Sequence, residues 1–279
     1  QKNNDFNFIA TLNLNKNSLL LDILRYKKDQ NLNSEVNFNV SYKKDKTIKF
    51  DEISLLDADQ NTFIIKGLNL NSKFKIIDIN KLHLDFINSN KIKNKISLEK
   101  LKNEYKIHGI SFDASRLIDD VLNNENKDKE TSYIFDNLSS NIHINIKKTY
   151  LDKDAYVNDL KGNIFYQNNK INQLNLDSIF SNKKKLTLTI NTNKKNEKIT
   201  TLFSNYPKPL VKRYKFIKGF DEGVLDFYSI KKNGISNSVL NIDNFKVQEV
   251  PVLAKLLTLA SLQGIADILT GEGIRFTDF

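Results

Sequence analysis

The three histidines are the first residues to consider for chemistry, because an imidazole can bind a metal ion or transfer a proton near neutral pH. His83, His108 and His143 each stand in an alternating, strand-like pattern of apolar residues. None of them has a second His or a Glu at the spacing of a metal site. We therefore interpret all three as ordinary strand positions.

Acidic residues offer two further candidates for a site. Residues 57–61, Asp-Ala-Asp-Gln-Asn, begin like a calcium-binding loop. Thr62 and Leu68 stand where such a loop requires Gly and Glu, so a polar turn is the better interpretation. Asp221 and Glu222 lie in a glycine-flanked segment that indicates a hairpin tip rather than an acid/base pair.

Nucleophile and nucleotide motifs are missing from the sequence as well. The chain has no Cys, which excludes disulfides and thiolate chemistry, and it contains no GxSxG, P-loop or GxGxxG pattern. We expect a protein that is not an enzyme and that uses neither a metal ion nor an organic cofactor.

The elements that carry these residues are mostly strands, because apolar and polar residues alternate along much of the chain. The polar positions are largely Asn, Lys, Asp, Ser and Thr, which predicts an antiparallel sheet with one apolar and one hydrated face. Asn233-Gly234 is the strongest hairpin signal. The candidate residues of the apolar face are Phe6, Phe8, Leu12, Val36, Phe38, Val40, Leu82, Leu84, Phe86, Ile142, Ile144, Ile146, Leu174, Leu176, Leu186, Leu188 and Ile190.

Two segments have helical rather than alternating patterns. Residues 113–123 predict a short helix, with Ser111 or Asp113 available as its N-cap. Residues 250–270 are apolar on nearly every side, so this second helix must be buried or must face an apolar partner. Gly264 predicts a bend in it. We expect this segment to pack against the apolar side of the sheet rather than to span a bilayer.

A resemblance to a known family rests on that second helical segment. The run PVLAKLLTLASLQGIADILTGEGIRF, preceded by NIDNFKV, resembles the AsmA-like C-terminal region of YhdP-type bacterial envelope proteins. The segment HGISFDASRLIDDVL resembles a second phrase of that family, and residues 206–233 resemble a third more loosely. The residues that carry the helical motif are Pro251, Leu253, Leu256, Leu257, Ala260, Ser261, Leu262, Gly264, Asp267, Gly271, Glu272, Gly273 and Phe276.

The resemblance implies a mainly β fold, a long curved antiparallel sheet that forms a β-groove, with one short helix and one C-terminal apolar helical segment. In the family such a groove conducts phospholipid between the inner and outer membranes. The implied partners are phospholipid or another acyl lipid, a membrane reached through an anchor absent from this sequence, and unidentified envelope proteins. The implied location is the periplasmic face of the inner membrane.

This interpretation divides the chain into four parts. Residues 1–122 form the first part of the groove and end in the short helix, and residues 123–131 form a polar linker. Residues 132–249 form the second part of the groove. Residues 250–279 hold the helical segment and the start of a C-terminal continuation that the family resemblance implies.

Composition leaves two other classes of protein open. A net charge of +10 over 279 residues invites a nucleic-acid interpretation, but the lysines gather at expected turns such as 183–185 and 194–195 rather than along one stripe. Nucleic acid is therefore an unlikely partner. A structural or adhesive β-sandwich would bury the same apolar faces against a second sheet. A continuous apolar trough, a closed two-sheet core or a contiguous Lys face would distinguish the three.

Overall fold

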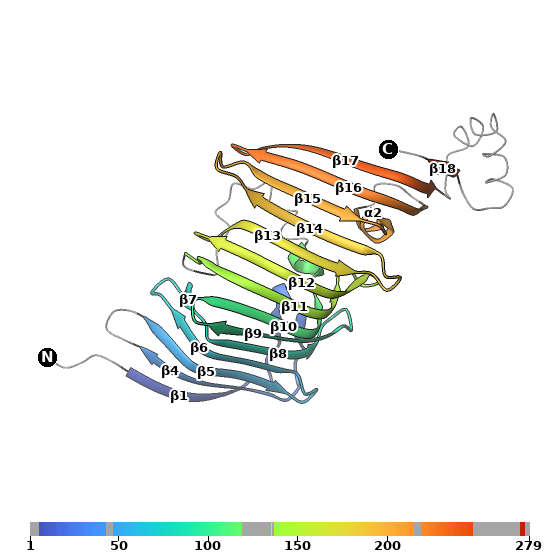
Figure 1. Ribbon diagram of the computed structural model, residues 1–279. Helices are drawn as coiled ribbons and strands as arrows, with labels where there is room; N and C mark the ends of the chain where they lie inside the picture. The colour runs from blue at the N-terminus through green and yellow to red at the C-terminus, as the bar shows by residue number, and fades with distance from the viewer. Residues whose placement is uncertain are drawn as a thin grey trace. The chain divides into compact units, whose positions relative to one another are not determined.

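The chain forms two compact units that consist mostly of strands (Figure 1). The computed structural model describes residues 6–42, 47–118, 135, 137–214, 219–247 and 274–276. Unit 1 is Gln1–Asn172 and unit 2 is Gln173–Phe279. The division falls inside the second predicted part of the groove, residues 132–249, while the predicted linker at 123–131 lies outside the described residues.

Unit 1 is built on one curved sheet (Figure 1). Its strands, in spatial order, are β1 (Phe6–Asn13), β4 (Ser34–Tyr42), β5 (Ile48–Asp57), β6 (Thr62–Leu70), β8 (Lys81–Ile87), β9 (Lys93–Leu101), β10 (Glu104–Asp113), β11 (Ser140–Tyr150) and β12 (Tyr156–Gln167). The short strand β7 (Ile76–Asp78) also pairs with β6. A separate two-stranded sheet consists of β2 (Leu19–Leu21) and β3 (Tyr26–Lys28), joined by the 3-10 helix η1 (Asp22–Leu24).

The prediction of a mainly β fold is confirmed, and the prediction of purely antiparallel pairing is wrong at one place. β10 and β11 run parallel, in a register from Glu104 opposite Asn141 to Asp113 opposite Tyr150. Parallel neighbours cannot be joined by a tight hairpin and need a long crossover connection. The chain between Asp113 and Ser140 is this crossover.

The crossover begins with the short helix that the sequence predicts. Residues 115–118 are helical, and the rest of the predicted range 113–123 beyond Ile118 lies outside the described residues. Asp113 caps the start, because its carboxylate accepts a hydrogen bond from the Ser115 backbone N–H at 3.0 Å. Ser111, the other proposed cap, instead donates its hydroxyl to the backbone carbonyl of Lys93.

Two irregular positions keep the apolar side chains of unit 1 on one face. Strict alternation would place Phe50 and Ile53 on opposite faces. The pairing of β4 with β5 shifts between Asn39 and Val40, which leaves Asp51 as an extra residue and returns both side chains to the same side. In β6, Gly67 has a φ of 60° and reverses the alternation in the same way.

Unit 2 contains an antiparallel sheet with one short helix. Its elements are β13 (Lys170–Ile179), which begins three residues before the unit boundary, β14 (Lys185–Thr192), β15 (Lys198–Ser204), α2 (Lys208–Tyr214), β16 (Phe220–Lys232), β17 (Ile235–Val247) and β18 (Ile274–Phe276). The predicted hairpin at Asn233-Gly234 is confirmed: both residues have positive φ, 51° and 81°, and the closing pair is Lys232 opposite Ile235.

The predicted C-terminal helical segment lies outside the described residues from 250 to 273. Residues 274–276, which follow it, form β18 and pair antiparallel with β17. Phe276 is therefore a strand residue, and its ring stacks on Phe245 with the centroids 5.1 Å apart.

Candidate functional site

The cross-strand registers bring all twelve candidate residues of unit 1 onto one face of its sheet. We call this the apolar face. One row of residues that face one another crosses the sheet through Leu12, Val36, Leu55, Phe63, Leu84, Ile96, Gly109, Ile146 and Leu160. The next row is Ala10, Phe38, Ile53, Ile65, Leu82, Leu98, Ile107 and Ile144.

The apolar face is covered near both ends of its strands. At one end the β2–η1–β3 segment packs on it, and the Tyr26 ring lies 4.6 Å from that of Phe63 and 5.7 Å from that of Phe86. At the other end Ile79, Tyr105 and neighbouring apolar residues form a second cluster. These two clusters hold most of the buried apolar residues of unit 1, and Ile92, Ile146 and Val157 are buried outside them.

Part of the apolar face stays partly exposed, although six of the eight residues in the row from Ala10 to Ile144 also pack against the second cluster. Every residue of the row from Ala10 to Ile144 is neither fully buried nor fully exposed. On β1 the exposure is greater: Phe6 is 54% and Phe8 55% exposed. Exposed apolar side chains that are contiguous rather than scattered mark a binding surface. Unit 1 therefore offers an apolar surface that crosses many strands.

Unit 2 has an apolar face of its own, which contains the remaining five candidates. Leu176 faces Leu188, and Leu174 faces Ile190, while Leu186 occupies the next position along β14 on the same side. Leu174 and Leu186 are buried and the other three are half-buried. Helix α2 covers part of this unit's core, where the fully buried Val211 packs with Phe220, Leu225 and Ile242.

The sequence did not identify several residues that fill the face between the candidates. Leu55, Phe63, Ile65, Leu98 and Ile107 complete the two rows. Apolar and polar residues do alternate in short runs of β5 and β6. The bulge at Asp51 and the reversal at Gly67 interrupt this alternation, so the runs do not continue along the whole strand.

The opposite face of unit 1 is polar and carries the three histidines. Ser97 lies between His83 and His108 in the register, and the His83 Nδ1 atom is 2.9 Å from the Ser97 hydroxyl. These residues border a shallow hollow of about 340 Å³. His143 contacts Glu104 at 3.0 Å, and this hydrogen bond raises the pKa of His143 above its usual value.

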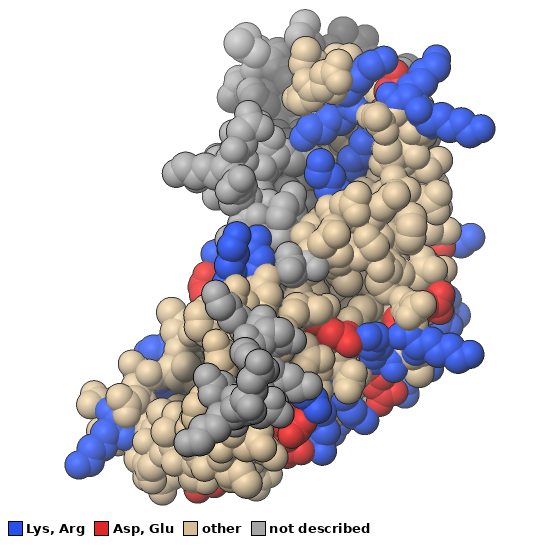
Figure 2. Space-filling view, turned by 90° about the vertical axis from the view of Figure 1, so that its left-hand side faces the viewer, with Lys and Arg blue, Asp and Glu red and all other residues tan. Residues whose placement is uncertain are grey.

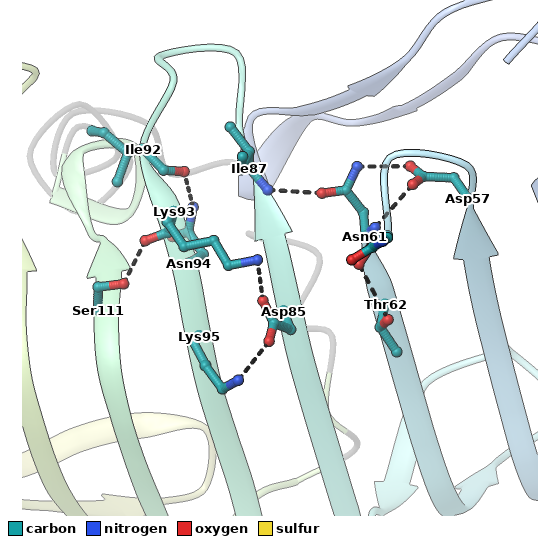
Figure 3. Close-up of polar contacts among 11 residues, drawn as sticks. Asp57, Asn61, Thr62, Asp85, Ile87, Ile92, Lys93, Asn94, Lys95 and Ser111 are labelled. Carbon is teal, nitrogen blue, oxygen red and sulfur yellow. Dashed lines mark hydrogen bonds and ion pairs between the residues drawn. The ribbon is translucent and has the colours of Figure 1, made fainter.

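The residues that begin like a calcium loop form a capped turn instead (Figure 3). The Asp57 carboxylate accepts hydrogen bonds from the Asn61 backbone N–H at 2.9 Å, the Asn61 side-chain amide at 2.8 Å and the Tyr26 hydroxyl at 2.6 Å. Asn61 in turn accepts a hydrogen bond from the Ile87 N–H at 2.9 Å. Burial and then the hydrogen bond to Asp57 raise the pKa of Tyr26. Asp57 and Asn61 thus satisfy buried polar groups at the strand ends.

Cross-strand ion pairs cover the polar face. Asp85 lies between Lys93 and Lys95 on the next strand, and its contact with Lys95 is 2.8 Å (Figure 3). Burial alone would raise the pKa of Asp85, but the two lysines outweigh it and lower that pKa. Other lysines pair with acids in the same way, so this face is hydrated and not a single basic field.

The predicted hairpin tip at Asp221 and Glu222 is wrong, because both residues lie within β16 opposite β17. Glu222 and Gly223 have φ of 59° and 87°, and the resulting irregularity produced the turn-like sequence. Asp221 pairs with Lys208 at 3.0 Å and Glu222 with Lys246 at 3.0 Å. The two carboxylates therefore have separate partners.

Neither a metal centre nor a membrane-spanning helix is found in the described part of the chain. These residues include no group of three His, Asp or Glu side chains placed to hold a metal ion. The helices described among them are all too short or too polar to cross a membrane. Comparison of the chain with protein-family models, with curated proteins and with solved structures found no match.

Proposed function

We propose that this chain binds the acyl chains of phospholipid along the apolar faces of its sheets and, as part of an AsmA-like envelope protein, conducts phospholipid between the inner and outer bacterial membranes. The observation that carries the proposal is the partly exposed row from Ala10 to Ile144. An acyl chain needs a long apolar surface without polar interruption, and this row offers one. The envelope location rests on the family resemblance of residues 251–276.

The mechanism is solvation rather than reaction. Removing one CH₂ group from water stabilises the complex by about 0.8 kcal/mol, so a dozen methylenes give about 10 kcal/mol before the cost of ordering the chain. Apart from Ala10, the row consists of chemically similar Phe, Leu and Ile side chains, and a lipid therefore gains nearly the same free energy at each of these positions. Uniform binding of this kind permits the lipid to slide.

A test compares substitutions on the apolar face of the unit 1 sheet with matched substitutions on its polar face. Phe8→Asn combined with Phe38→Asn makes the apolar face polar at exposed or half-exposed positions, where the fold tolerates the change. Ile9→Asn combined with Leu56→Asn is the matched control, because these exposed apolar residues lie on the polar face.

Native mass spectrometry of the purified chain then measures co-purified phospholipid. We expect the wild type and the control variant to carry equal amounts, and the apolar-face variant to lose most of its lipid. Circular dichroism checks that all three remain β-rich. A lipid-free wild type, or equal loading of the two variants, would contradict the proposal.

The sandwich alternative has no specific observation in its favour. A structural or adhesive sandwich would cover the apolar face with a second sheet. Among the described residues of unit 1, the second sheet consists of the β2–β3 pair alone, which packs on one end of the face.

A further inference from the structure

The hollow on the polar face of unit 1 lies where the pairing of β9 with β10 is irregular. The register shifts between Gly109 and Ser111, which makes Ile110 an extra residue, and its side chain is 56% exposed. A bulge bends its strand and changes the direction of neighbouring side chains. The hollow has a volume of about 340 Å³, at the lower end of the range for ligand pockets. It therefore suits a small ligand.

One cross-strand row supplies the hydrogen-bonding groups of the hollow. The row runs through His83, Ser97, His108 and Asn145, and all four residues border the hollow. The His83 Nδ1 atom lies 2.9 Å from the Ser97 hydroxyl oxygen. If His83 Nδ1 donates, the hydroxyl hydrogen of Ser97 is free, and if the hydroxyl donates, the neutral ring carries its hydrogen on Nε2. Either tautomer leaves this pair with one donor for a ligand.

His108 supplies a second donor by a similar argument. Its Nδ1 atom is buried and has no hydrogen-bond partner in the described part of the chain. A buried N–H without an acceptor is costly, so the neutral ring carries its hydrogen on Nε2 instead. The His108 ring can therefore donate from Nε2 at the border of the hollow.

Two lysines give the border of the hollow a positive charge. Lys95 shares the single carboxylate of Asp85 with Lys93, so this group of three has a surplus positive charge (Figure 3). Lys147 also borders the hollow, and its side chain is exposed. It forms no ion pair with an acid of the described strands, Asp159 on β12 included. The hollow thus combines hydrogen-bond donors with uncompensated positive charge.

We propose that this hollow binds a phosphate group, either as free phosphate or as the terminal group of a small phosphate monoester. A dianion with several acceptor oxygens can use the His and Ser donors together with the ammonium groups of Lys95 and Lys147. The same lysines disfavour a metal cation. The hollow lies on the face opposite the apolar face, so this proposal does not depend on the binding of acyl chains.

The test follows the imidazole resonances of the purified chain by NMR during titration with inorganic phosphate or glycerol 3-phosphate. The ionic strength is held constant with chloride at about pH 8, where a phosphate monoester is a dianion. The chain has three histidines, and His83→Gln and His108→Gln assign two of the resonances. His143 is an internal control, because its ring contacts the Glu104 carboxylate at 3.0 Å and does not border the hollow.

We expect the resonances of His83 and His108 to move and to saturate with added phosphate, while that of His143 stays in place. Lys147→Gln should raise the Kd about tenfold, and Ser97→Ala about threefold, because these changes remove one charged and one neutral hydrogen bond. Lys106→Gln is the matched control, since Lys106 is an exposed lysine on the strand of His108 that does not border the hollow. Its effect should stay below about twofold.

The comparison of the two ligands identifies the source of the phosphate group. Tighter binding of glycerol 3-phosphate supports a monoester, and tighter binding of inorganic phosphate supports free phosphate. Equal movement of all three histidine resonances would show a general ionic effect and overturn the proposal. Saturable binding that is unchanged in both Lys147→Gln and Ser97→Ala would place the phosphate elsewhere and overturn it too. An unmoved His143 resonance in each variant shows that the sheet is folded.

Discussion

Individual polar residues determine where the strands of unit 1 end. Lys28 is completely buried, and its ammonium group donates to the backbone carbonyls of Leu14 at 2.8 Å, Asn17 at 2.6 Å and Asp29 at 3.1 Å. Asp113 is 6% exposed and accepts hydrogen bonds from two Asn side chains and one backbone N–H. A buried polar group without partners is costly, so each of these side chains stabilises one arrangement of the loops.

Asp113 makes the stability of unit 1 dependent on pH. Burial alone would raise the pKa of its carboxyl group, but the hydrogen bonds from Ser115, Asn88 and Asn90 outweigh burial and hold that pKa below the usual value. A carboxylate whose pKa is lower in the folded state stabilises the fold above its unfolded pKa of about 3.9. That stabilisation is lost as the pH falls through the lower, folded value.

We therefore expect Asp113→Asn to lose less unfolding free energy than the wild type when the pH is lowered from neutral to strongly acidic. Urea unfolding at several pH values measures this difference. Asp154→Asn, at an exposed turn, should follow the wild type. Parallel pH profiles of Asp113→Asn and the wild type would count against this assignment.

Irregular positions within strands determine how closely neighbouring strands can approach each other. Gly109 lies where the pairing of β10 with β9 shifts before Ser111. A Cβ atom at Gly109 would lie 2.5 Å from the backbone carbonyl oxygen of Lys95, so a side chain there requires the two strands to move apart. The glycine thus permits close approach of the backbones at this bulge.

We expect Gly109→Ala to lower the unfolding free energy by about 1–3 kcal/mol, the usual cost of overpacking. Gly234→Asn is the control: its φ of 81° suits Asn, and no atom lies within 4 Å of the added Cβ. Its effect should stay within about 0.5 kcal/mol. Urea denaturation of both variants measures the difference, and equal stability would exclude the clash.

The sequence predicted the strands and the apolar residues better than the connections between strands. Alternation such as Ile142, Ile144 and Ile146 is local, and it identified the face of each strand. The parallel partner of β10 was not predictable, because alternation does not encode which strand lies beside which. Helix α2 was missed because its seven residues are too few to show a helical period.

At the scale of the whole molecule, charge is distributed rather than concentrated. The net charge is +10, but lysines on the sheet surface pair with acids across strands, as Lys66 does with Glu52 at 2.7 Å and Lys81 with Glu99 at 2.9 Å. In Figure 2 the Lys and Arg side chains lie in several separate groups around broad uncharged areas. Such a surface keeps sheets soluble without forming a path for a phosphate backbone.

We accordingly expect the chain to show no measurable affinity for duplex DNA at physiological salt. Fluorescence anisotropy of a labelled duplex tests this at several salt concentrations. Lys183→Gln combined with Lys184→Gln and Lys185→Gln should leave both folding and lipid loading unchanged, because these residues are exposed and lie in and beside a turn. Tight binding, with log K falling linearly with log salt, would favour the nucleic-acid alternative.

The parallel pairing of β10 with β11 has a kinetic consequence. Hairpins such as β9–β10 close short loops and form early, whereas Glu104 and Asn141 are 37 positions apart in the chain. Closing a longer loop costs more conformational entropy and delays its contacts. We therefore expect two sets of hairpins to assemble independently, one before and one after the crossover, and the β10–β11 ladder to join them as a late step of folding.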